Sequence, residues 1–329
     1  MRAVAYKRPG SAVEVLEVIE PPDPTPAPGE VRVAVEFSAV NPTDVKRRQV
    51  EAPLFGPLQI PHHDGSGVID QVGPGVDPQR IGERVWLFNA AHNRSHGTAA
   101  QFVCLPSGQA VHLPDSSSML DGATTGIPTM TAAHALRLTR LREGQTILVT
   151  GAGGAVGSAA VALAHARGAY VLAAVSSDTK ATIARTCGAD DVIVYSTEGL
   201  ADGLVRRDRA LHAVIDVAIG QHLPAYLPSL HDKACVVSYS SDAPDVNIPV
   251  RPLMFANARL EFFVIYALST EEIEQAKNDA YQALTAGTTP GLPVQIFDLE
   301  SSIQAHEHVE SRSLGRAVLR INSAASSDE

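Results

Sequence analysis

Three glycines at three-residue spacing, Gly151, Gly154 and Gly157, stand between an apolar segment at 147–149 and an Ala-rich run that starts at Ala155. Glycine lets the backbone turn tightly, approach a ligand closely and bring a helix against a strand. The unpaired N–H groups at the start of a helix, with the positive end of its dipole, attract an anion. The segment therefore predicts a strand-to-helix turn that binds the pyrophosphate of a dinucleotide.

The spacing departs from the G-x-G-x-x-G pattern, because Val156 occupies the place of its third glycine. The context favours a dinucleotide site all the same. A second predicted strand, at 170–175, follows at the distance expected of a strand–helix–strand unit. The alternative is a glycine-rich turn that binds nothing.

The residues after this second strand bear on the choice of dinucleotide. NAD enzymes usually place an acid there, which binds the ribose 2′-hydroxyl. Here Ser176 and Ser177 place hydroxyls at the strand end, and Lys180 places a cation one turn into the next helix. This set suits a 2′-phosphate, so we predict NADPH. The alternative is that Ser177 only caps a helix, and an Asp178 that pointed inward to the ribose would contradict the prediction.

Composition and charge exclude several classes of protein. The 329 residues are 45% hydrophobic and 19% charged, which allows a large core and is long for one domain. A formal net charge of −10 without a basic stripe argues against a nucleic-acid partner. No apolar run is long enough for a membrane span, and the N-terminal residues lack the apolar segment of a signal peptide. We therefore predict a cytoplasmic protein with no membrane partner.

The cysteines agree with that location. Cys104, Cys187 and Cys235 are far apart and odd in number. This pattern predicts reduced, buried thiols rather than a disulfide framework or a zinc knuckle.

The pattern of residues changes along the chain. Up to about residue 114, short alternating segments such as 31–37 and 67–72 are separated by Pro and Gly clusters, which predicts a twisted all-β unit. From about residue 116, helical patterns alternate with apolar strands, which predicts a parallel, doubly wound sheet. Its strands are expected at 147–149, 170–175, 192–195, 213–217 and 234–239.

The C-terminal part returns to the first pattern. After a predicted helix at 270–286, the segment 294–321 has short apolar runs and is expected to rejoin the first domain. The last seven residues are predicted to be disordered. Gly168 and Gly188 follow two of the helices, where a left-handed cap residue is expected. The predicted domains are 1–118, 119–292 and 293–329.

Six further segments accompany the glycine turn. They are Asn41-Pro-Thr-Asp44, His63-Asp-Gly-Ser-Gly-Val-Ile69, Gly82-Glu-Arg-Val-Trp86, Gly97-Thr-Ala-Ala-Gln-Phe102, Gly126-Ile-Pro-Thr-Met-Thr131 and Gly315-Arg-Ala-Val-Leu319. In this order, and over nearly the whole chain, they resemble the medium-chain dehydrogenase/reductase superfamily. Within it, they resemble the zinc-free quinone oxidoreductases related to ζ-crystallin.

The resemblance implies an α/β protein with two domains. One is a GroES-like β-barrel domain, and the other is a doubly wound Rossmann domain with a parallel six-stranded sheet. A cleft between them would hold NADPH and the substrate. The resemblance also implies a homodimer joined along an outer Rossmann strand, for which our candidate is 258–268.

Alcohol dehydrogenases of the superfamily hold a catalytic zinc through three protein ligands. In this sequence Asn41 matches the first ligand position and Ile127 the neighbourhood of the third, so only His63 remains. One imidazole cannot complete the set that catalytic zinc needs, and the four-cysteine structural lobe is absent. We therefore predict no metal. Four histidines in two loops expected near the cleft are surface or core residues, or adventitious metal ligands; they are His62, His63, His92 and His96.

Without a metal, catalysis would rest on positioning and hydrogen bonding, because negative charge develops on the substrate oxygen during hydride transfer. By its position in the family motif, Asn41 is implied as a donor to this oxygen, and Thr131 as a residue near the nicotinamide or the substrate. Related enzymes often carry a tyrosine five residues after the asparagine, where this chain has Lys46. Lys46 is either a proton donor or a solvated cation. Asp44 is expected to orient the loop.

Four more residues are assigned to the cofactor. Tyr195, at the end of the third strand, is a candidate for the 2′-phosphate. Ser238 and Tyr239, at the end of a later strand, are candidates for the nicotinamide ribose, and Arg316 in the last motif completes the set. Ordinary packing is the alternative for the strand-end residues.

The predicted function is zinc-independent transfer of hydride from NADPH to a quinone or a related conjugated carbonyl compound. Three alternatives stay open. They are an NADPH-dependent reductase of enone C=C bonds, a zinc-dependent alcohol dehydrogenase and a non-enzymatic NADPH-binding protein.

Overall fold

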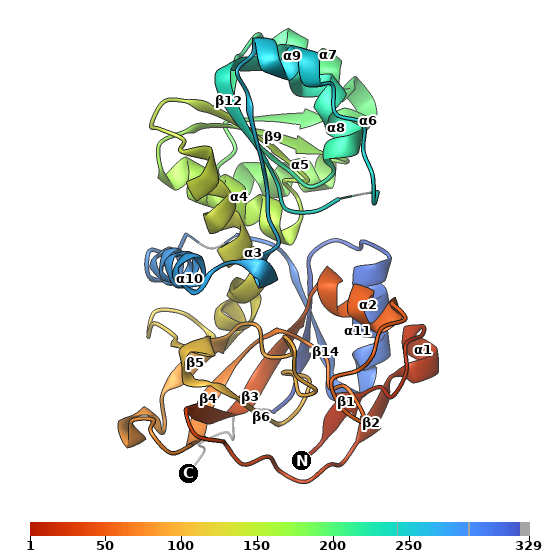
Figure 1. Cartoon of the computed structure of the whole chain (residues 1–329), viewed down its shortest axis with the longest axis vertical. Helices are drawn as coiled ribbons and strands as arrows, with labels where there is room; N and C mark the ends of the chain where they lie inside the picture. The colour runs from red at the N-terminus through yellow and green to blue at the C-terminus, as the bar shows by residue number, and fades with distance from the viewer. Residues whose placement is uncertain (242, 289, 323–329) are drawn as a thin grey trace. The chain divides into compact units, whose positions relative to one another are not determined.

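The computed structural model describes residues 1–241, 243–288 and 290–322 (Figure 1). The predicted disorder of the tail concerns residues outside these ranges. The chain divides into two units, Met1–Ile127 with Pro293–Glu329, and Pro128–Leu292.

The first division falls inside helix α3 (Met119–Thr139) rather than before it, where the change in sequence pattern had suggested a boundary. The helix is interrupted at Gly126, whose backbone angles (φ −25°, ψ −113°) are not helical. The break therefore separates two helical segments that the sequence pattern runs together.

The first unit contains a sheet of seven strands, all antiparallel except for the parallel pair at one edge. Val31, Val33 and Val35 are fully buried, because alternate side chains of a strand point to one face. A separate antiparallel pair is formed by β1 (Ala3–Ala5) and β2 (Glu17–Ile19). In sheet order the seven strands are β14 (Val294–Asp298), β15 (Arg316–Arg320), β3 (Glu30–Val40), β4 (Asp64–Val72), β5 (Arg84–Leu87) and β7 (Ala110–His112), with β6 (Phe102–Pro106) also paired to β3.

The prediction of an all-β first unit was incomplete, because within its described residues it contains three whole α-helices and the start of α3. The whole helices are α1 (Ala12–Val15), α2 (Pro42–Gln49) and α11 (Ser302–Glu310). Helix α2 begins with a proline, which is suited to the first helical position. The carboxylate of Asp44 accepts the backbone N–H of Asn41 at 2.8 Å, which fixes the start of this helix. Asp44 thus orients the loop, as expected.

The second unit has the parallel, doubly wound sheet of six strands that was predicted (Figure 1). The strand order reverses between β8 and β11, and in such sheets ligands bind outside the carboxyl ends of the strands at that point. The strands, in sheet order, are β10 (Asp191–Val194), β9 (Tyr170–Val175), β8 (Thr146–Thr150), β11 (Leu211–Asp216), β12 (Leu230–Ser238) and β13 (Arg259–Phe262).

Helices connect these strands, with left-handed glycines where they were expected. Gly168 and Gly188 have φ values of 72° and 100°. The helices are α4 (Ala155–Ala166), α5 (Asp178–Thr186), α6 (Tyr195–Glu198), α7 (Leu200–Arg207), α8 (Ile219–Tyr226), α9 (Val250–Phe255) and α10 (Thr270–Thr285).

Two details of the strand prediction were wrong. Tyr195 begins α6 instead of ending β10. The candidate outer strand is only four residues long, because the chain leaves β13 after Phe262 and forms a short 3₁₀ turn at Ile265–Ala267. Apolar β-favouring residues continue through this segment, so the sequence pattern gave no sign of the strand's end.

Candidate functional site

The glycine turn has the geometry that its three positions require. Gly151 adopts a left-handed conformation (φ 61°). Gly157 lies so close to the preceding strand that a Cβ there would be 2.2 Å from the carbonyl oxygen of Gly151. Gly154 is the N-cap of α4 and is exposed, and a Cβ there would meet only that same oxygen, at 3.4 Å. The head of α4 is therefore open to a ligand.

The amides at the head of α4 belong to residues that reach the surface. Ala155 and Val156 are partly exposed, as the first two residues of the helix. The first N–H groups of a helix have no acceptor within it. Such groups can bind the oxygens of a pyrophosphate, and this role stays a prediction.

The structure brings Lys180 and Ser176 to this turn. The Lys180 Nζ donates to Ser176 Oγ at 3.3 Å. The stem of Lys180 lies against Gly153, where an added Cβ would be 2.6 Å from the Lys180 Cβ. A cation and a hydroxyl thus stand next to the pyrophosphate turn.

Ser177 and Asp178 lie as the alternative interpretation expects, at the start of a helix. Ser177 is the N-cap of α5, and its hydroxyl accepts the backbone N–H of Lys180 at 3.4 Å. Asp178 is exposed in the first turn of the helix. Neither observation places a carboxylate where a ribose hydroxyl would need one.

The sequence analysis gave no role to a buried carboxylate at the end of β11. This strand lies next to β8, at the point where the strand order reverses. Asp216, the last residue of β11, is fully buried. Its Oδ1 accepts the Thr150 hydroxyl at 2.7 Å and the Ala218 N–H at 3.0 Å. Thr150, in turn, accepts the N–H of Val217 at 3.1 Å. Asp216 therefore links the ends of β8 and β11 next to the glycine turn.

Asp216 is ionised in this setting. Burial raises the pKa of its carboxyl, but hydrogen bonds from His222 and Thr150 outweigh burial and bring the pKa below its usual range. Burial also raises the pKa of Tyr239, with a further rise from the charge of Asp216. The Ser238 hydroxyl donates to the Asp216 backbone oxygen at 3.3 Å, so both predicted strand-end residues lie around this carboxylate.

The first unit buries a second cluster of polar residues. The Asn41 Nδ2 donates to the Asp64 carboxylate at 2.7 Å, and the Asn41 Oδ1 accepts from Arg316 at 3.2 Å. Asp64 also accepts the backbone N–H of Ile127, at 3.0 and 3.1 Å from its two oxygens. The residues at two ligand positions of the zinc enzymes thus bind Asp64, and one N–H of the Asn41 amide is already engaged.

Two carboxyl groups in this cluster titrate unusually. Burial raises the pKa of Asp64 to about 6, against the lowering effect of the Arg316 charge. Burial raises the pKa of Asp44 well above its usual range, and the charge of Asp64 adds to the rise. Arg316 is the buried cation that compensates both, and its own pKa is lowered by burial. The sequence placed Arg316 at the cofactor, and that assignment stays a prediction.

His62 is part of a buried chain of hydrogen bonds with a defined direction. The Thr98 hydroxyl donates to the Asp64 carbonyl oxygen at 2.6 Å, so Ser38 must donate to Thr98, at 2.7 Å. The Nδ1 of His62 then donates to Ser38 at 2.8 Å, which leaves its Nε2 to accept from the Nε2 of His306 at 3.0 Å. Both rings are neutral, and together they connect α11 to the backbone of Asp64.

This buried chain of hydrogen bonds predicts that the folded state loses stability in acid. Burial, with the nearby charge of Arg48, lowers the pKa of His306 to about 3, against about 6.5 in an unfolded chain. The unfolded state therefore binds more protons between these values, so the stabilisation is complete above about pH 6.5 and is lost as the pH falls. One such histidine changes the free energy of unfolding by about 1.4 kcal/mol per pH unit.

His306→Gln is expected to reduce the slope of unfolding free energy against pH by about that amount between pH 6 and 4. Urea denaturation followed by the fluorescence of Trp86, the single tryptophan and fully buried in the same unit, measures it. The exposed His231→Gln is the control and should leave the slope unchanged. An unchanged slope in the His306 variant would contradict the assigned neutral pair.

The other predicted residues are placed as follows. His63 is buried, with its Nε2 3.8 Å from the Asp44 Oδ1, and burial together with the nearby charge of Arg94 lowers its pKa to about 3. Lys46 is exposed on α2. Thr131 is buried in the part of α3 that belongs to the second unit. Within the described ranges, no three His, Cys, Asp or Glu side chains gather as a metal-binding group.

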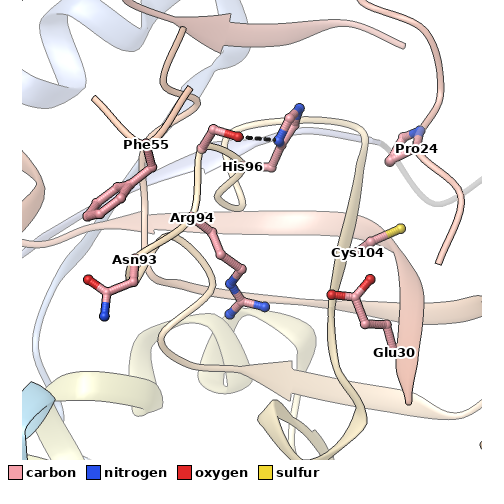
Figure 2. A pocket seen from close by; sticks show the side chains of 8 residues that line it. Pro24, Glu30, Phe55, Asn93, Arg94, His96 and Cys104 are labelled. Carbon is pink, nitrogen blue, oxygen red and sulfur yellow. Dashed lines mark hydrogen bonds between the residues drawn. The ribbon is translucent and has the colours of Figure 1, made fainter. Parts of the chain in front are cut away.

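His96 lines a pocket in the first unit, shown in Figure 2. The pocket has a volume of about 340 Å³, and the His96 Nδ1 is hydrogen-bonded to the Ser95 hydroxyl at 2.9 Å. None of the predicted catalytic residues lines it. The lining residues are Pro24, Glu30, Phe55, Asn93, Arg94, Ser95, His96 and Cys104.

In the part of the chain that the structure describes, every helix is too short or too polar to cross a membrane.

Family models match both units. Residues 27–115 match the alcohol dehydrogenase GroES-like domain, and residues 155–280 match the zinc-binding dehydrogenase model. The chain belongs to the medium-chain dehydrogenase/reductase superfamily and is an oxidoreductase of that type. The resemblance carried by the sequence motifs is confirmed.

Relatives within the superfamily are similar to this chain over most of its length. Quinone oxidoreductase of Rattus norvegicus is 26% identical over 302 residues, 90% of each chain. A 2-haloacrylate reductase of a Burkholderia species is 26% identical over 334 residues, 97% of this chain and 98% of that protein. A mycocerosic acid synthase-like polyketide synthase of Mycolicibacterium smegmatis is 34% identical over 204 residues, but the chain matches only 9% of its length.

Among solved structures, a mycobacterial protein complexed with NADPH superposes with a TM-score of 0.83 at 24% identity, covering 97% of this chain and 100% of that one. This similarity concerns the fold.

Proposed function

We propose that the protein transfers a hydride from NADPH to a conjugated carbonyl acceptor, a quinone or an enone, without a metal. The observation that carries the proposal is the position of Lys180 and Ser176 against the open glycine turn. When bound, NADPH supplies the hydride. The relatives support the acceptor class, because one is named a quinone oxidoreductase and another a reductase of a haloacrylate.

The residues that would hold the cofactor have distinct tasks. The amides of Ala155 and Val156 bind the pyrophosphate, and Lys180 with Ser176 binds the 2′-phosphate. Ser238 and Tyr239, at the end of β12, bind the nicotinamide ribose.

For the acceptor, Asn41 and Thr131 stabilise the charge that develops on the oxygen. Asn41 is suited to a fixed donor, because Asp64 and Arg316 hold its amide at both ends. Lys46, exposed on α2, is the candidate for proton delivery. The zinc alternative is disfavoured because Ile127 offers a backbone N–H to Asp64, and not a side-chain ligand, at the third ligand position.

We also propose a homodimer through the outer edge of the Rossmann sheet. Strand β13 is the edge strand, and the edge of a sheet leaves backbone groups open to pairing. Phe262, the last residue of β13, is 58% exposed, and Val264, which follows the strand, is 56% exposed. Sedimentation equilibrium should give twice the mass of the 34.7 kDa chain, and a lone chain at micromolar concentration would contradict the dimer.

A screen of reduced cofactors against acceptors tests the activity. Oxidation is followed at the absorbance band of reduced nicotinamide, with 1,4-benzoquinone and a simple enone in parallel. Tight NADPH binding with background rates for every acceptor would instead favour a non-enzymatic NADPH-binding protein.

Lys180→Ala is expected to weaken NADPH binding by about 10- to 100-fold, because a charge-assisted hydrogen bond to the 2′-phosphate is lost. NADH binding should change less than about twofold, since NADH has no such phosphate. Titration of each cofactor measures both constants. Arg185→Ala, which removes an exposed cation from the last turn of the same helix, is the control. Equal losses for the two cofactors would reject the 2′-phosphate site.

A further inference from the structure

His222 lies at the carboxyl edge of the Rossmann sheet in an unusual position. It is the fourth residue of α8, which follows β11, and its side chain is 13% exposed. Its ring centroid is 6.0 Å from that of Tyr195, the first residue of α6, which follows β10. The two strands are separated by β9 and β8 in the sheet, hence by roughly 14 Å at about 4.8 Å per strand. The two side chains must therefore reach over the ends of β9 and β8.

A dinucleotide that extends from the glycine turn toward Ser176 has to pass along this same edge. The turn follows β8 and Ser176 follows β9. The part of the molecule that lies there, beyond the pyrophosphate, is the adenosine half. Tyr195 and His222 thus stand where the adenosine would end.

The hydrogen bond behind the ring decides what His222 can offer. Its Nδ1 is 2.7 Å from the Oδ1 of Asp216, an ionised carboxylate, which is an acceptor only. When the ring is neutral, its proton lies on Nδ1, which donates to Asp216, and Nε2 is left with a lone pair. Among the residues that the structure describes, none is hydrogen-bonded to this Nε2.

The Nε2 of His222, with the Asp216 carboxylate behind the ring, is poorly suited to bind a phosphate. A phosphate has no proton to donate at neutral pH, and its negative charge is repelled by the carboxylate. The Nε2 suits a neutral N–H donor. The adenine ring carries one, its exocyclic amine. We propose that His222, oriented by Asp216, binds the adenine amine of the dinucleotide through Nε2. This assignment rests on the proposed function and adds the residue that recognises the base.

The wild-type protein tests it directly. NADPH is compared with its hypoxanthine analogue, in which a carbonyl oxygen replaces the amine, by calorimetric titration. We expect NADPH to bind about tenfold more tightly, the size of effect given by one hydrogen bond whose loss leaves polar atoms unpaired. Equal affinities would overturn the assignment.

His222→Phe keeps a ring beside Tyr195 but has no acceptor. It is expected to weaken NADPH about tenfold and the analogue hardly at all, so that the two bind alike. Gln221→Ala, an exposed neighbour on α8, is the control and should keep the wild-type preference. An equal loss for both ligands, or a preference that survives in the phenylalanine variant, would overturn the proposal.

The outcomes also separate this inference from the proposed function. If neither NADPH nor NADH binds the wild-type protein, both fail. If the dinucleotides bind and Lys180→Ala discriminates between them while the hypoxanthine analogue binds as well as NADPH, only the role of His222 fails.

Discussion

Gly154→Val is expected to abolish dinucleotide binding, with an affinity loss of at least about 100-fold for NADPH and NADH alike. Gly154 is exposed at the head of α4, and the protein itself leaves room for a Cβ there, with the nearest atom at 3.4 Å. The space that the valine methyl groups would enter is the space that the pyrophosphate needs in order to reach the helix amides. The loss corresponds to roughly 3 kcal/mol of binding free energy.

The fold should survive this change. Titration of each cofactor gives the affinity, and far-UV circular dichroism with thermal melting shows whether the second unit is intact. A melting temperature close to that of the wild type together with lost binding is the expected pair of results. If the variant still binds the dinucleotide, the pyrophosphate does not lie at this turn.

Gly157→Ala is the matched control, because here the protein and not the ligand leaves no room. Its Cβ would lie 2.2 Å from the carbonyl oxygen of Gly151, which is backbone and cannot move aside as a side chain can. We expect a lower melting temperature in this variant even without ligand. Both glycines belong to the same three-residue repeat, yet we expect Gly154 to be needed for the ligand and Gly157 for the fold.

The contrast shows what the sequence could reveal about this site. The turn, strand β9 and the set Ser176 with Lys180 lie within the 30 residues from 151 to 180, so local spacing was enough to predict them. The prediction of no zinc had another basis, the comparison of Asn41, His63 and Ile127 with the ligand positions of the resembling family, and it stays a prediction. The family resemblance then extended the fold prediction to the two domains and their order along the chain.

Asp216, by contrast, ends an apolar strand, and the sequence analysis gave it no role. Its partners Thr150 and His222 come from the end of β8 and from α8, which lie far apart in the sequence. The order β8–β11 places strands side by side that are more than 60 residues apart in the chain. Such a cluster depends on sheet order, which residue spacing does not contain.

Asp64 was missed for a different reason. It stands in a recognised motif beside His63, and attention to zinc ligands made the histidine the residue of interest. In the structure it is Asp64 that receives the Asn41 amide and the Ile127 N–H. Helix α2 was also unexpected, because eight residues rich in charge show little apolar periodicity.

Arg316→Met is expected to destabilise the first unit by about 3–5 kcal/mol, because it leaves buried carboxylates without their cation. Arg316 is 5% exposed, and Asp44 and Asp64 are 3% and 0% exposed. The arginine lowers the pKa of both carboxyls and holds the Asn41 amide as well. Urea denaturation followed by Trp86 fluorescence measures the loss. Arg320→Met, which removes an exposed arginine from the same strand, should change stability by less than about 0.5 kcal/mol.

The dependence of this loss on pH separates charge from packing. In the wild type, burial already raises the pKa of Asp64 to about 6, above the value of about 3.9 in an unfolded chain. The folded state therefore binds more protons in this window, and the contribution of Asp64 to stability falls as the pH rises through it. Without Arg316 both carboxyl pKa values rise further, so the variant should be most destabilised at pH 8 and recover part of the loss at pH 5, where the carboxyls are protonated. Adding Asp64→Asn to the variant should recover stability at pH 8 in the same way. A loss that is equal at both pH values, and that Asp64→Asn does not reduce, would mean that Arg316 only fills space between β15 and the Asn41 loop.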